Sequence, residues 1–147
     1  MKLFNVRVYG LLLDEGRILV SDELIKGHKI TKFPGGGLEF GEGTVDCVIR
    51  EFKEELNLSI EVVDHFYTTD FFVASAFNPS SQVISIYYHV RALEPINAKI
   101  SETEFDFDPL KEEDQAFRWL KVDELHQNNF TFAIDKKVSL LLNRKLH

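Results

Sequence analysis

One arginine and several glutamates between residues 36 and 58 stand at spacings that suit the binding of a divalent metal against phosphate. The stretch reads GGLEFGEGTVDCVIREFKEELNL. If residues 45–56 form a helix, a turn of about 100° per residue places Glu51, Glu54 and Glu55 on one face. Neighbouring carboxylates repel each other unless a cation neutralises them. Hard oxygen ligands suit Mg²⁺ or Mn²⁺, which bridge to substrate phosphates.

The helix itself is predicted from its pattern. Thr44 is a plausible N-cap, and neither proline nor glycine interrupts the sequence from Val45 to Leu56. The predicted core side of this helix consists of Val45, Val48, Ile49, Phe52 and Leu56. Glutamates on a helix usually form only a solvated face, so the sequence EFKEEL would carry little weight alone.

The run FPGGG, which precedes the helix by a short loop, gives the carboxylates their context. Pro34 and the three glycines permit the backbone to approach a metal or phosphate closely, because no side chain blocks it. A glycine run alone is more often a flexible turn. Combined with Glu42, Arg50 and the carboxylate face, it indicates a phosphate-handling site.

These residues resemble the signature of the Nudix hydrolases, G-x5-E-x7-R-E-U-x-E-E-x-G-U, in which U is a bulky apolar residue. Eight of the nine specified positions agree, from Gly36 through Glu42, Arg50 and Glu51 to Leu58. The exception is Asn57, which stands where the family has glycine just after the helix. Asparagine is the next-best residue for a left-handed conformation, so the departure is conservative.

The resemblance implies a Nudix fold, a mixed β-sheet in an α/β/α sandwich, with residues 1–147 as a single Nudix domain. It also implies a metal-dependent pyrophosphohydrolase that cleaves a diphosphate linkage in a nucleoside diphosphate derivative, with Mg²⁺ or Mn²⁺ as cofactor. One alternative is a Nudix-type ligand-binding or regulatory domain without hydrolysis, although such domains often lose signature carboxylates. A diphosphate isomerase on the same fold is disfavoured because the only cysteine, Cys47, lies within the helix.

The resemblance also implies roles for individual residues. Glu51, Glu54, Glu55 and the Gly35 carbonyl are the expected metal ligands. Arg50 and Glu42 are expected to hold these carboxylates in place through paired hydrogen bonds. The general base is either Glu54 or an acid of a distant loop, for which the candidates are Glu112, Glu113 and Asp114.

Substrate contacts are predicted for Lys32, Phe71 and Glu113. The attached group is read by loops and strands outside the signature, so the sequence leaves its identity open. Val73 stands near the position where ADP-ribose hydrolases tend to carry proline, so this subfamily mark is absent.

Composition sets the outer limits. A chain of 147 residues with 44% hydrophobic content fits one domain, and a net charge of −7 disfavours a nucleic-acid partner.

The N-terminus lacks the charged, apolar and small-residue segments of a signal peptide in their usual order, and no apolar run could span a membrane, so we expect a cytoplasmic protein. Apolar strands with an uncovered edge would be compatible with a homodimer. Cys47 is expected to be an ordinary packing residue.

The remaining pattern predicts the elements that must position the site. Residues 3–13 and 17–23 are predicted strands joined by a turn at 14–16, and residues 59–77 and 82–93 are predicted to be long paired strands. The segment 24–33 is interpreted as a basic loop and 94–114 as an extended loop. A strand at FRWL and a last helix at about 135–145 complete the prediction.

Overall fold

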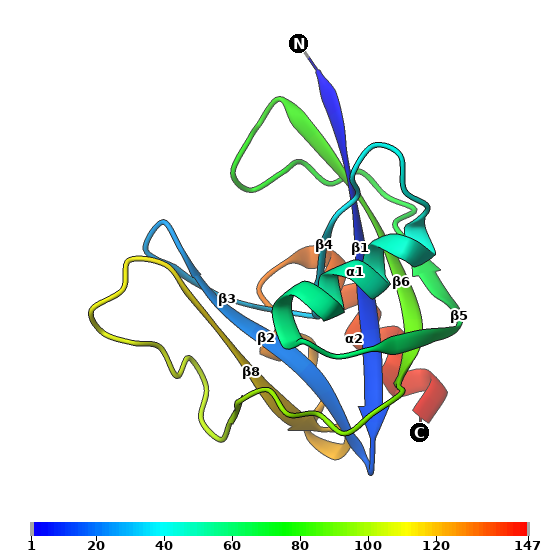
Figure 1. The fold of residues 1–147 in the computed structure, drawn as a ribbon. Coiled ribbons are helices and arrows are strands. Elements are labelled where there is room, and N and C mark those ends of the chain that lie inside the picture. The colour runs from blue at the N-terminus through cyan, green and yellow to red at the C-terminus, as the bar shows by residue number, and fades with distance from the viewer. Residues whose placement is uncertain (1, 147) are drawn as a thin grey trace. The chain divides into compact units, whose positions relative to one another are not determined.

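Strands make up most of the regular structure in residues 2–146, the part of the chain that the computed structural model describes, and α1 follows the first four of them (Figure 1). The strands are β1 (Leu3–Asp14), β2 (Arg17–Ile25), β3 (His28–Lys32), β4 (Gly35–Gly37), β5 (Ile60–Thr68), β6 (Ser81–Ala92), β7 (Ile100–Ser101) and β8 (Asp114–Lys121). The helices are α1 (Thr44–Leu56), α2 (Ala133–Leu146) and two short 3₁₀ turns, Val122–Glu124 and Gln127–Asn129. Parallel and antiparallel pairings both occur, so the predicted mixed α/β class is confirmed.

The chain forms two compact units. The first unit consists of the residues up to 12 together with 34–97, and the second unit consists of 13–33 together with the residues from 98 onward. The predicted carboxylate site belongs to the first unit. Whether the chain acts as the single domain expected from the sequence stays a prediction.

The sheet of the first unit is built around β6 and β1, which run parallel from the pair Leu3 and Ser81 to the pair Leu12 and Val90. Antiparallel β5 adds to the other edge of β6, and antiparallel β4 adds to β1. Helix α1 packs against this sheet (Figure 1). Gly10 makes the packing close, because a Cβ there would stand 2.5 Å from a ring carbon of Phe52.

The buried side of α1 consists of Cys47, Val48, Phe52 and Leu56. The prediction that Val45 belongs to the core was wrong, since its side chain is 41% exposed. Val45 lies in the first turn of the helix.

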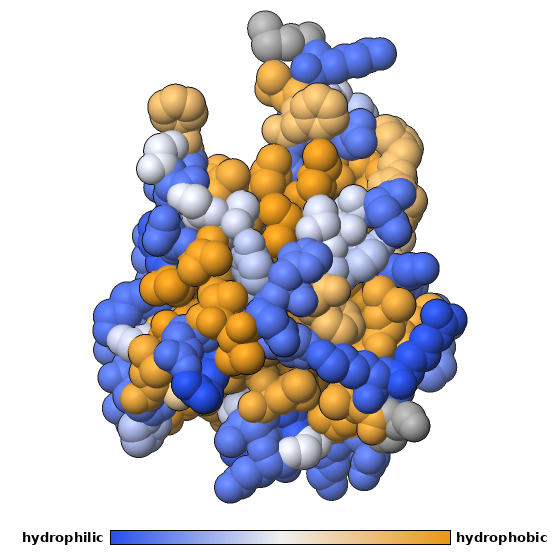
Figure 2. All heavy atoms as spheres, turned by 90° about the vertical axis from the view of Figure 1, so that its right-hand side faces the viewer, coloured by the Kyte–Doolittle hydropathy of each residue, from blue (hydrophilic) through white to orange (hydrophobic). Residues whose placement is uncertain are grey.

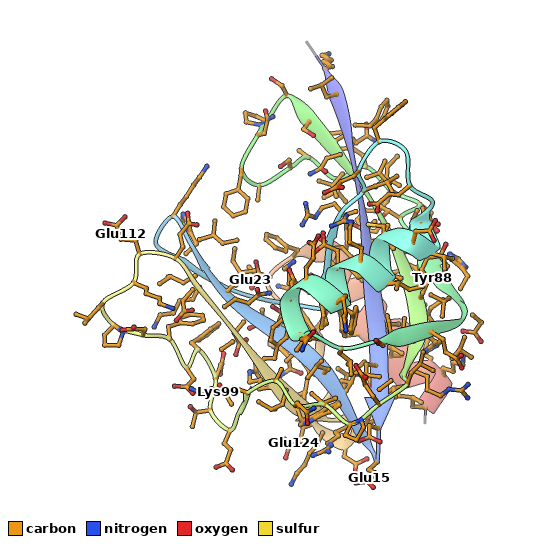
Figure 3. All side chains as sticks on the ribbon, viewed as in Figure 1. Glu15, Glu23, Tyr88, Lys99, Glu112 and Glu124 are labelled. Atoms are coloured by element: carbon orange, nitrogen blue, oxygen red, sulfur yellow. The ribbon has the colours of Figure 1, made fainter. Side chains whose placement is uncertain are left out.

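The ends of α1 differ from the prediction at one position. Gly43, not Thr44, is the N-cap residue, and its backbone N–H donates to Oδ2 of Asp46 at 3.3 Å. The Thr44 hydroxyl instead forms a 2.6 Å hydrogen bond with the hydroxyl of Tyr88 on β6, which lies beside the start of the helix (Figure 3). At the other end Asn57 adopts the predicted left-handed conformation, with φ of 50° and ψ of 38°.

The predicted strand 59–77 is too long, since β5 ends at Thr68. The next residue, Thr69, contacts Ser85 of β6 through both backbone and side chain. Its N–H donates to the Ser85 carbonyl at 2.9 Å, while its hydroxyl accepts from the Ser85 N–H at 2.9 Å and donates to the same carbonyl at 3.1 Å. Such local side-chain bonds compete with a ladder. The following residues are irregular apart from an isolated bridge between Ala74 and Gln82.

Hydrophobic side chains remain accessible at the surface of the first unit. Figure 2 shows apolar atoms gathered between hydrophilic ones on one face of the molecule. The exposed large hydrophobic residues of this unit are Leu3, Phe4, Phe40, Val45, Val63, Phe71, Phe72, Phe77 and Leu93. A concentration of this kind usually marks a contact surface.

In the second unit β2 pairs antiparallel with β8 on one edge and with β3 on the other. The predicted turn after β1 is confirmed, with Glu15 and Gly16 both at positive φ. The interpretation of 24–33 as a basic loop was wrong, because His28–Lys32 forms β3 after a tight turn at Lys26 and Gly27. The many charged residues of this segment favour a loop by composition, but Ile30 and Thr31 of the strand are buried.

The long segment before β8 is fastened to the second unit by a buried ion pair. Arg118 donates to Asp22 at 2.7 and 3.2 Å, and the backbone N–H of Phe105 donates to the same carboxylate at 3.1 Å. The segment is extended as predicted, except that β7 pairs parallel with β8.

The predicted last helix is confirmed as α2, with Ile134, Val138 and Leu142 buried. Neither helix within residues 2–146 is long and apolar enough to cross a membrane.

Candidate active site

The glycine run forms strand β4, which was not predicted, and it pairs with β1 through Arg7, Val8 and Tyr9. Gly35 has a φ of 150°, and a Cβ there would lie 2.1 Å from the Val8 carbonyl oxygen. Only glycine fits this position, because any side chain would collide with the backbone of β1. The glycines therefore fix a short strand at close range to its neighbour.

Gly36 brings β4 against the carboxylate face of α1. A Cβ on Gly36 would lie 2.5 Å from both Cδ and Oε1 of Glu51. The Glu51 carboxylate thus occupies the space that any other residue at position 36 would fill. Its side chain is only 13% exposed, so this carboxylate is held between the helix and β4.

Arg50 organises the acidic residues around it. Its Nε donates to Oε2 of Glu42 at 2.9 Å and its Nη2 donates to Oε1 of the same carboxylate at 2.7 Å. This is the paired geometry expected from the sequence, and it orients both groups. Nη2 also donates to the Gly37 carbonyl at 3.1 Å, which ties the helix to β4.

The other end of the guanidinium reaches three more carboxylates. Nη1 donates to Oε1 of Glu51 and to Oε2 of Glu54, each at 3.1 Å, and lies 3.6 Å from Oε1 of Glu39. Of the two α1 glutamates that bond to Arg50, Glu54 is the more exposed, at 59%. Four carboxylates thus share one guanidinium, and Glu55 lies one turn from Glu51 on the same helix.

The ion pair between Arg50 and Glu42 stabilises the charged form of both side chains and so shifts both pKa values. The hydrogen bonds from Arg50, and then the backbone N–H of Glu39, lower the pKa of Glu42 to about 2. The same carboxylate raises the pKa of Arg50, so the pair stays charged at any ordinary pH.

Cys47 is an inert neighbour of the cluster. Its Sγ lies 3.5 Å from the Gly37 carbonyl oxygen and 3.8 Å from Nη2 of Arg50, and it is buried. Burial, followed by the nearby Glu42 carboxylate, raises the pKa of this thiol to about 12. A protonated, buried thiol is a poor nucleophile, which agrees with the predicted packing role.

The donor set is suited to a hard divalent ion. Glu51, Glu54 and Glu55 offer only oxygen atoms, and the bare backbone at Gly36 leaves room for the Glu51 carboxylate. Within residues 2–146 no three acidic, histidine or cysteine side chains converge tightly enough to hold a metal ion by themselves. The carboxylates of Glu51 and Glu54 instead meet at Nη1 of Arg50.

The structure brings together most of the residues singled out from the sequence. Gly35 and Glu42, with Arg50 and the glutamates of α1, all belong to the first unit and share β4, α1 and the loop between them. Phe71 also belongs to the first unit but lies in the irregular segment after β5, with 40% of its side chain exposed. Its contact with substrate stays a prediction.

Two predicted substrate contacts belong to the second unit. Lys32 is buried on β3, and its Nζ lies 3.0 Å from Oε2 of Glu23. Glu113 is exposed just before β8. Asp114, a candidate base, accepts the backbone N–H groups of Asp108 and Gln115, which lower its pKa. The roles of Lys32 and Glu113 stay predictions.

Sequence reasoning missed two participants. Glu39 lies in the loop before α1 and its carboxylate approaches Arg50, but an acidic loop residue carries no distinguishing signal. Arg7 lies beside Gly37 across the β1–β4 pairing. No sequence pattern could have found it, because the pairing joins segments far apart in the chain.

Oxygen donors beside a glycine-rich strand suit phosphate chemistry, and comparison with known domains makes the chain a hydrolase of phosphorus-containing anhydrides. Its family follows from comparison with known domains. The NUDIX domain matches residues 1–141, and the chain therefore belongs to the Nudix family. Nudix hydrolases act on nucleoside diphosphate derivatives and generally use a divalent metal.

Several solved structures share the fold. A MutT protein from Methanosarcina mazei Go1 is similar at 17% identity with a TM-score of 0.71, over 99% of this chain and 96% of that one. A MutT NUDIX hydrolase from Burkholderia pseudomallei matches at 20% identity and 0.63, over 93% and 95%. An ADP-ribose pyrophosphatase from Streptococcus suis matches at 20% and 0.54, over 97% and 92%. At these identities the likeness confirms the predicted Nudix fold.

Proposed function

We propose that this chain is a Mg²⁺- or Mn²⁺-dependent pyrophosphohydrolase that cleaves the diphosphate linkage of a nucleoside diphosphate derivative. The observation that carries the proposal is the Arg50 cluster. Nε and Nη2 of Arg50 donate to the two oxygens of Glu42, while Nη1 donates to Glu51 and Glu54 beside β4. The signature carboxylates are thus present and held in one place.

Glu51, Glu54 and Glu55, with the Gly35 carbonyl, are the residues that would hold the ion. When bound, the ion supplies positive charge to the phosphate oxygens and acidifies the attacking water. Arg50 and Glu42 orient these ligands, a role in which outer partners commonly affect affinity or activity. Fixed ligands reduce the reorganisation needed when charge develops on phosphate.

Glu54 is the stronger candidate for the general base. Its exposed carboxylate can reach water, whereas the Glu51 carboxylate is almost enclosed against Gly36. Among the loop candidates, Asp114 is the weakest, because two backbone N–H donors lower its pKa and reduce its basicity. Glu112 and Glu113 stay as the alternative.

The attached group stays open among nucleoside diphosphate derivatives. One relative of known structure is described as a UDP-X diphosphatase and another as an ADP-ribose pyrophosphatase. Nucleotide sugars and ADP-ribose therefore belong in the first substrate panel, with nucleoside triphosphates and dinucleoside polyphosphates. A cytoplasmic location and a homodimer stay predictions from the sequence.

The test is phosphate-coupled hydrolysis across this panel, with Mg²⁺ and with chelator. We expect metal-dependent turnover of one class, lost in Glu51→Gln and in Glu55→Gln. Glu61→Gln is the matched control, because Glu61 pairs with Arg91 on the strands β5 and β6, outside the cluster. Unchanged turnover in both signature variants would reject the site. If the wild type binds Mg²⁺ but hydrolyses no member of the panel, the non-hydrolytic alternative is favoured.

A further inference from the structure

Four polar side chains share one face of the sheet in the second unit. Ser21 and Glu23 stand two residues apart on β2. Lys32 of β3 is the cross-strand partner of Ser21, and Gln115 of β8 is the cross-strand partner of Glu23. Directly paired residues point to the same face of a sheet, and so do residues two apart on one strand. These four residues are called the polar row below.

The contacts within the polar row meet at one oxygen of Glu23. Its Oε2 accepts from the Ser21 hydroxyl at 3.1 Å and from Nε2 of Gln115 at 3.4 Å, and it lies 3.0 Å from Nζ of Lys32. Within residues 2–146, each hydrogen bond and ion pair of this carboxylate falls on Oε2. The second oxygen, Oε1, is therefore an acceptor that a ligand can use.

The Ser21 hydroxyl fixes the direction of the Gln115 amide. A hydroxyl has one hydrogen, and Ser21 donates it to Glu23, so the Ser21 oxygen can only accept from Gln115. Nε2 of Gln115 donates to it at 2.9 Å. Because the amide nitrogen faces Ser21, the carbonyl oxygen Oε1 of Gln115 is directed away from it. Gln115 is only partly buried, so this oxygen is a second acceptor for a ligand.

The stability of the sheet does not explain the polar row. The side chains of Lys32 and Glu23 are only 8% and 14% exposed, and Ser21 is fully buried. A buried ion pair loses its hydration, and apolar residues of similar size often give equal or greater stability. The same face accepts such residues, because Phe117 pairs with Ser21 and is buried. Polar groups that a fold does not need are expected where a ligand binds.

Guanine is the nucleobase whose edge complements the polar row. From β3 through β2 to β8, the row offers the positive charge of Lys32, an acceptor on Glu23 and an acceptor on Gln115. The Watson–Crick edge of guanine carries, in the same order, the acceptor O6 and the donors N1–H and N2–H. Adenine and cytosine would place a ring acceptor against the Glu23 carboxylate, and uracil would place a carbonyl oxygen against Gln115.

From this geometry we propose that the polar row recognises the guanine base of the substrate, with Glu23 accepting N1–H, Gln115 accepting N2–H and Lys32 facing O6. This inference rests on the proposed function, because it names the base of the nucleoside diphosphate derivative. Gly35 is the third residue after Lys32, so covalent geometry keeps their Cα atoms within about 11 Å of each other. A nucleoside diphosphate is long enough to span that separation.

The test is isothermal titration of the full chain with nucleoside 5′-monophosphates in EDTA. These probes contain no diphosphate linkage, so the result is independent of metal and of hydrolysis. We expect GMP to bind at least about tenfold more tightly than AMP, CMP or UMP, each of which opposes two like groups at the row. IMP lacks only the N2 amino group of GMP and should bind about fivefold more weakly, the effect of one hydrogen bond.

Gln115→Met is the decisive variant, because it removes the acceptor for N2–H at a partly exposed position. It should bind IMP as the wild type does and lose the preference for GMP over IMP. A merely structural role of Gln115 would weaken both ligands alike. Gln82→Met, at a partly exposed glutamine on β6, is the matched control and should keep the preference.

Three results would each overturn the inference: equal binding of GMP and AMP, an unchanged preference for GMP over IMP in Gln115→Met, or no binding of GMP to the wild type at millimolar concentration. These results leave the proposed function intact, because metal-dependent hydrolysis of the substrate panel tests it separately. A guanine preference without any such hydrolysis would overturn the proposed function and leave the base contact in place.

Discussion

At the scale of single residues, Arg50 decides how the acidic side chains are arranged. A helix face alone would leave its glutamates to repel each other, whereas the guanidinium gives Glu51 and Glu54 a shared partner. The fork to Glu42 uses two nitrogens in parallel, and the remaining nitrogen serves Glu51 and Glu54. Geometry as well as charge is therefore needed at this position.

Arg50→Lys should separate these two requirements. Lysine keeps the charge but cannot contact Glu42 at two points and reach Glu51 and Glu54 together. We expect a loss of turnover of about 10–100-fold, the usual effect of removing a group that orients metal ligands. Steady-state kinetics at saturating Mg²⁺ will measure it, with Lys53→Arg, an exposed position on α1, as the control. Turnover within twofold of wild type would show that charge alone suffices.

Glu42 gives the protein a stability contribution that depends on pH. Its pKa in the folded state is about 2, below the ordinary value of 4.5, so the folded protein favours the ionised form. The contribution is fully present above about pH 4.5 and is lost as the pH falls toward about 2. Urea unfolding of wild type and Glu42→Gln at pH 7, 4 and 2.5 measures this.

The difference in unfolding free energy between the two proteins should be largest at pH 7 and shrink through this acid range. Asp64→Asn, an exposed carboxylate on β5, serves as the control and should show a much smaller dependence. A difference that stayed constant from pH 7 to pH 2.5 would contradict the assignment of the shift to Glu42.

At the scale of elements, β4 determines how near the backbone comes to the carboxylate helix. Three glycines pair with β1, and the middle one, Gly36, faces Glu51. Strands rarely consist of glycine, which loses much conformational entropy on folding. Glycine is needed at Gly35 and Gly36, because a side chain there would collide with the backbone of β1 or with the Glu51 carboxylate.

Gly36→Ala should damage the site more than the fold. The added Cβ would lie 2.5 Å from the Glu51 carboxylate, which must move away from β4 and from Arg50. We expect turnover to fall at least about tenfold. Gly16→Ala is unsuitable as a control because its φ is 75°, so the matched comparison is Gly37→Ala, whose nearest neighbour lies at an ordinary 3.6 Å.

Thermal unfolding and kinetics of both alanine variants distinguish the effects. Gly37→Ala should melt close to the wild type, and Gly36→Ala should melt lower with a disproportionate loss of turnover. Equal turnover in Gly36→Ala and wild type would show that the position of Glu51 is not critical.

At the scale of the whole molecule, the balance of charge and apolar surface bears on association. The chain has a net charge of −7, which favours solubility, yet the first unit exposes several large hydrophobic side chains, among them Phe4 and Phe72. An apolar surface of this kind gains free energy when a second copy covers it.

We therefore expect self-association into a homodimer. Light scattering coupled to size-exclusion chromatography should give a mass near twice 17.0 kDa at micromolar concentration. Phe4→Ser and Phe72→Ser together should shift the equilibrium toward monomer, while Phe107→Ser, in the second unit, should not. A wild-type mass of 17.0 kDa at every concentration would contradict the expectation.

Much of the site was determined by the sequence alone. The positions of Arg50 and the glutamates of α1 follow from helical spacing, which is local, and the left-handed turn at Asn57 follows from the same kind of rule. The hairpin after β1 and the helix α2 were predictable for this reason too. Local patterns dictate such features because the interacting residues are neighbours in the chain.

Only the tertiary structure decided what these residues face. The glycine run became a strand because β1 offers it hydrogen bonds, and the basic segment became β3 because β2 does. The strand predicted to reach residue 77 ends at Thr68, next to the point where the Thr69 hydroxyl takes up the Ser85 N–H of the neighbouring strand. Arg7 came to Gly37 through the same long-range pairing. Sheet partners lie far apart in sequence, so no local rule specifies them.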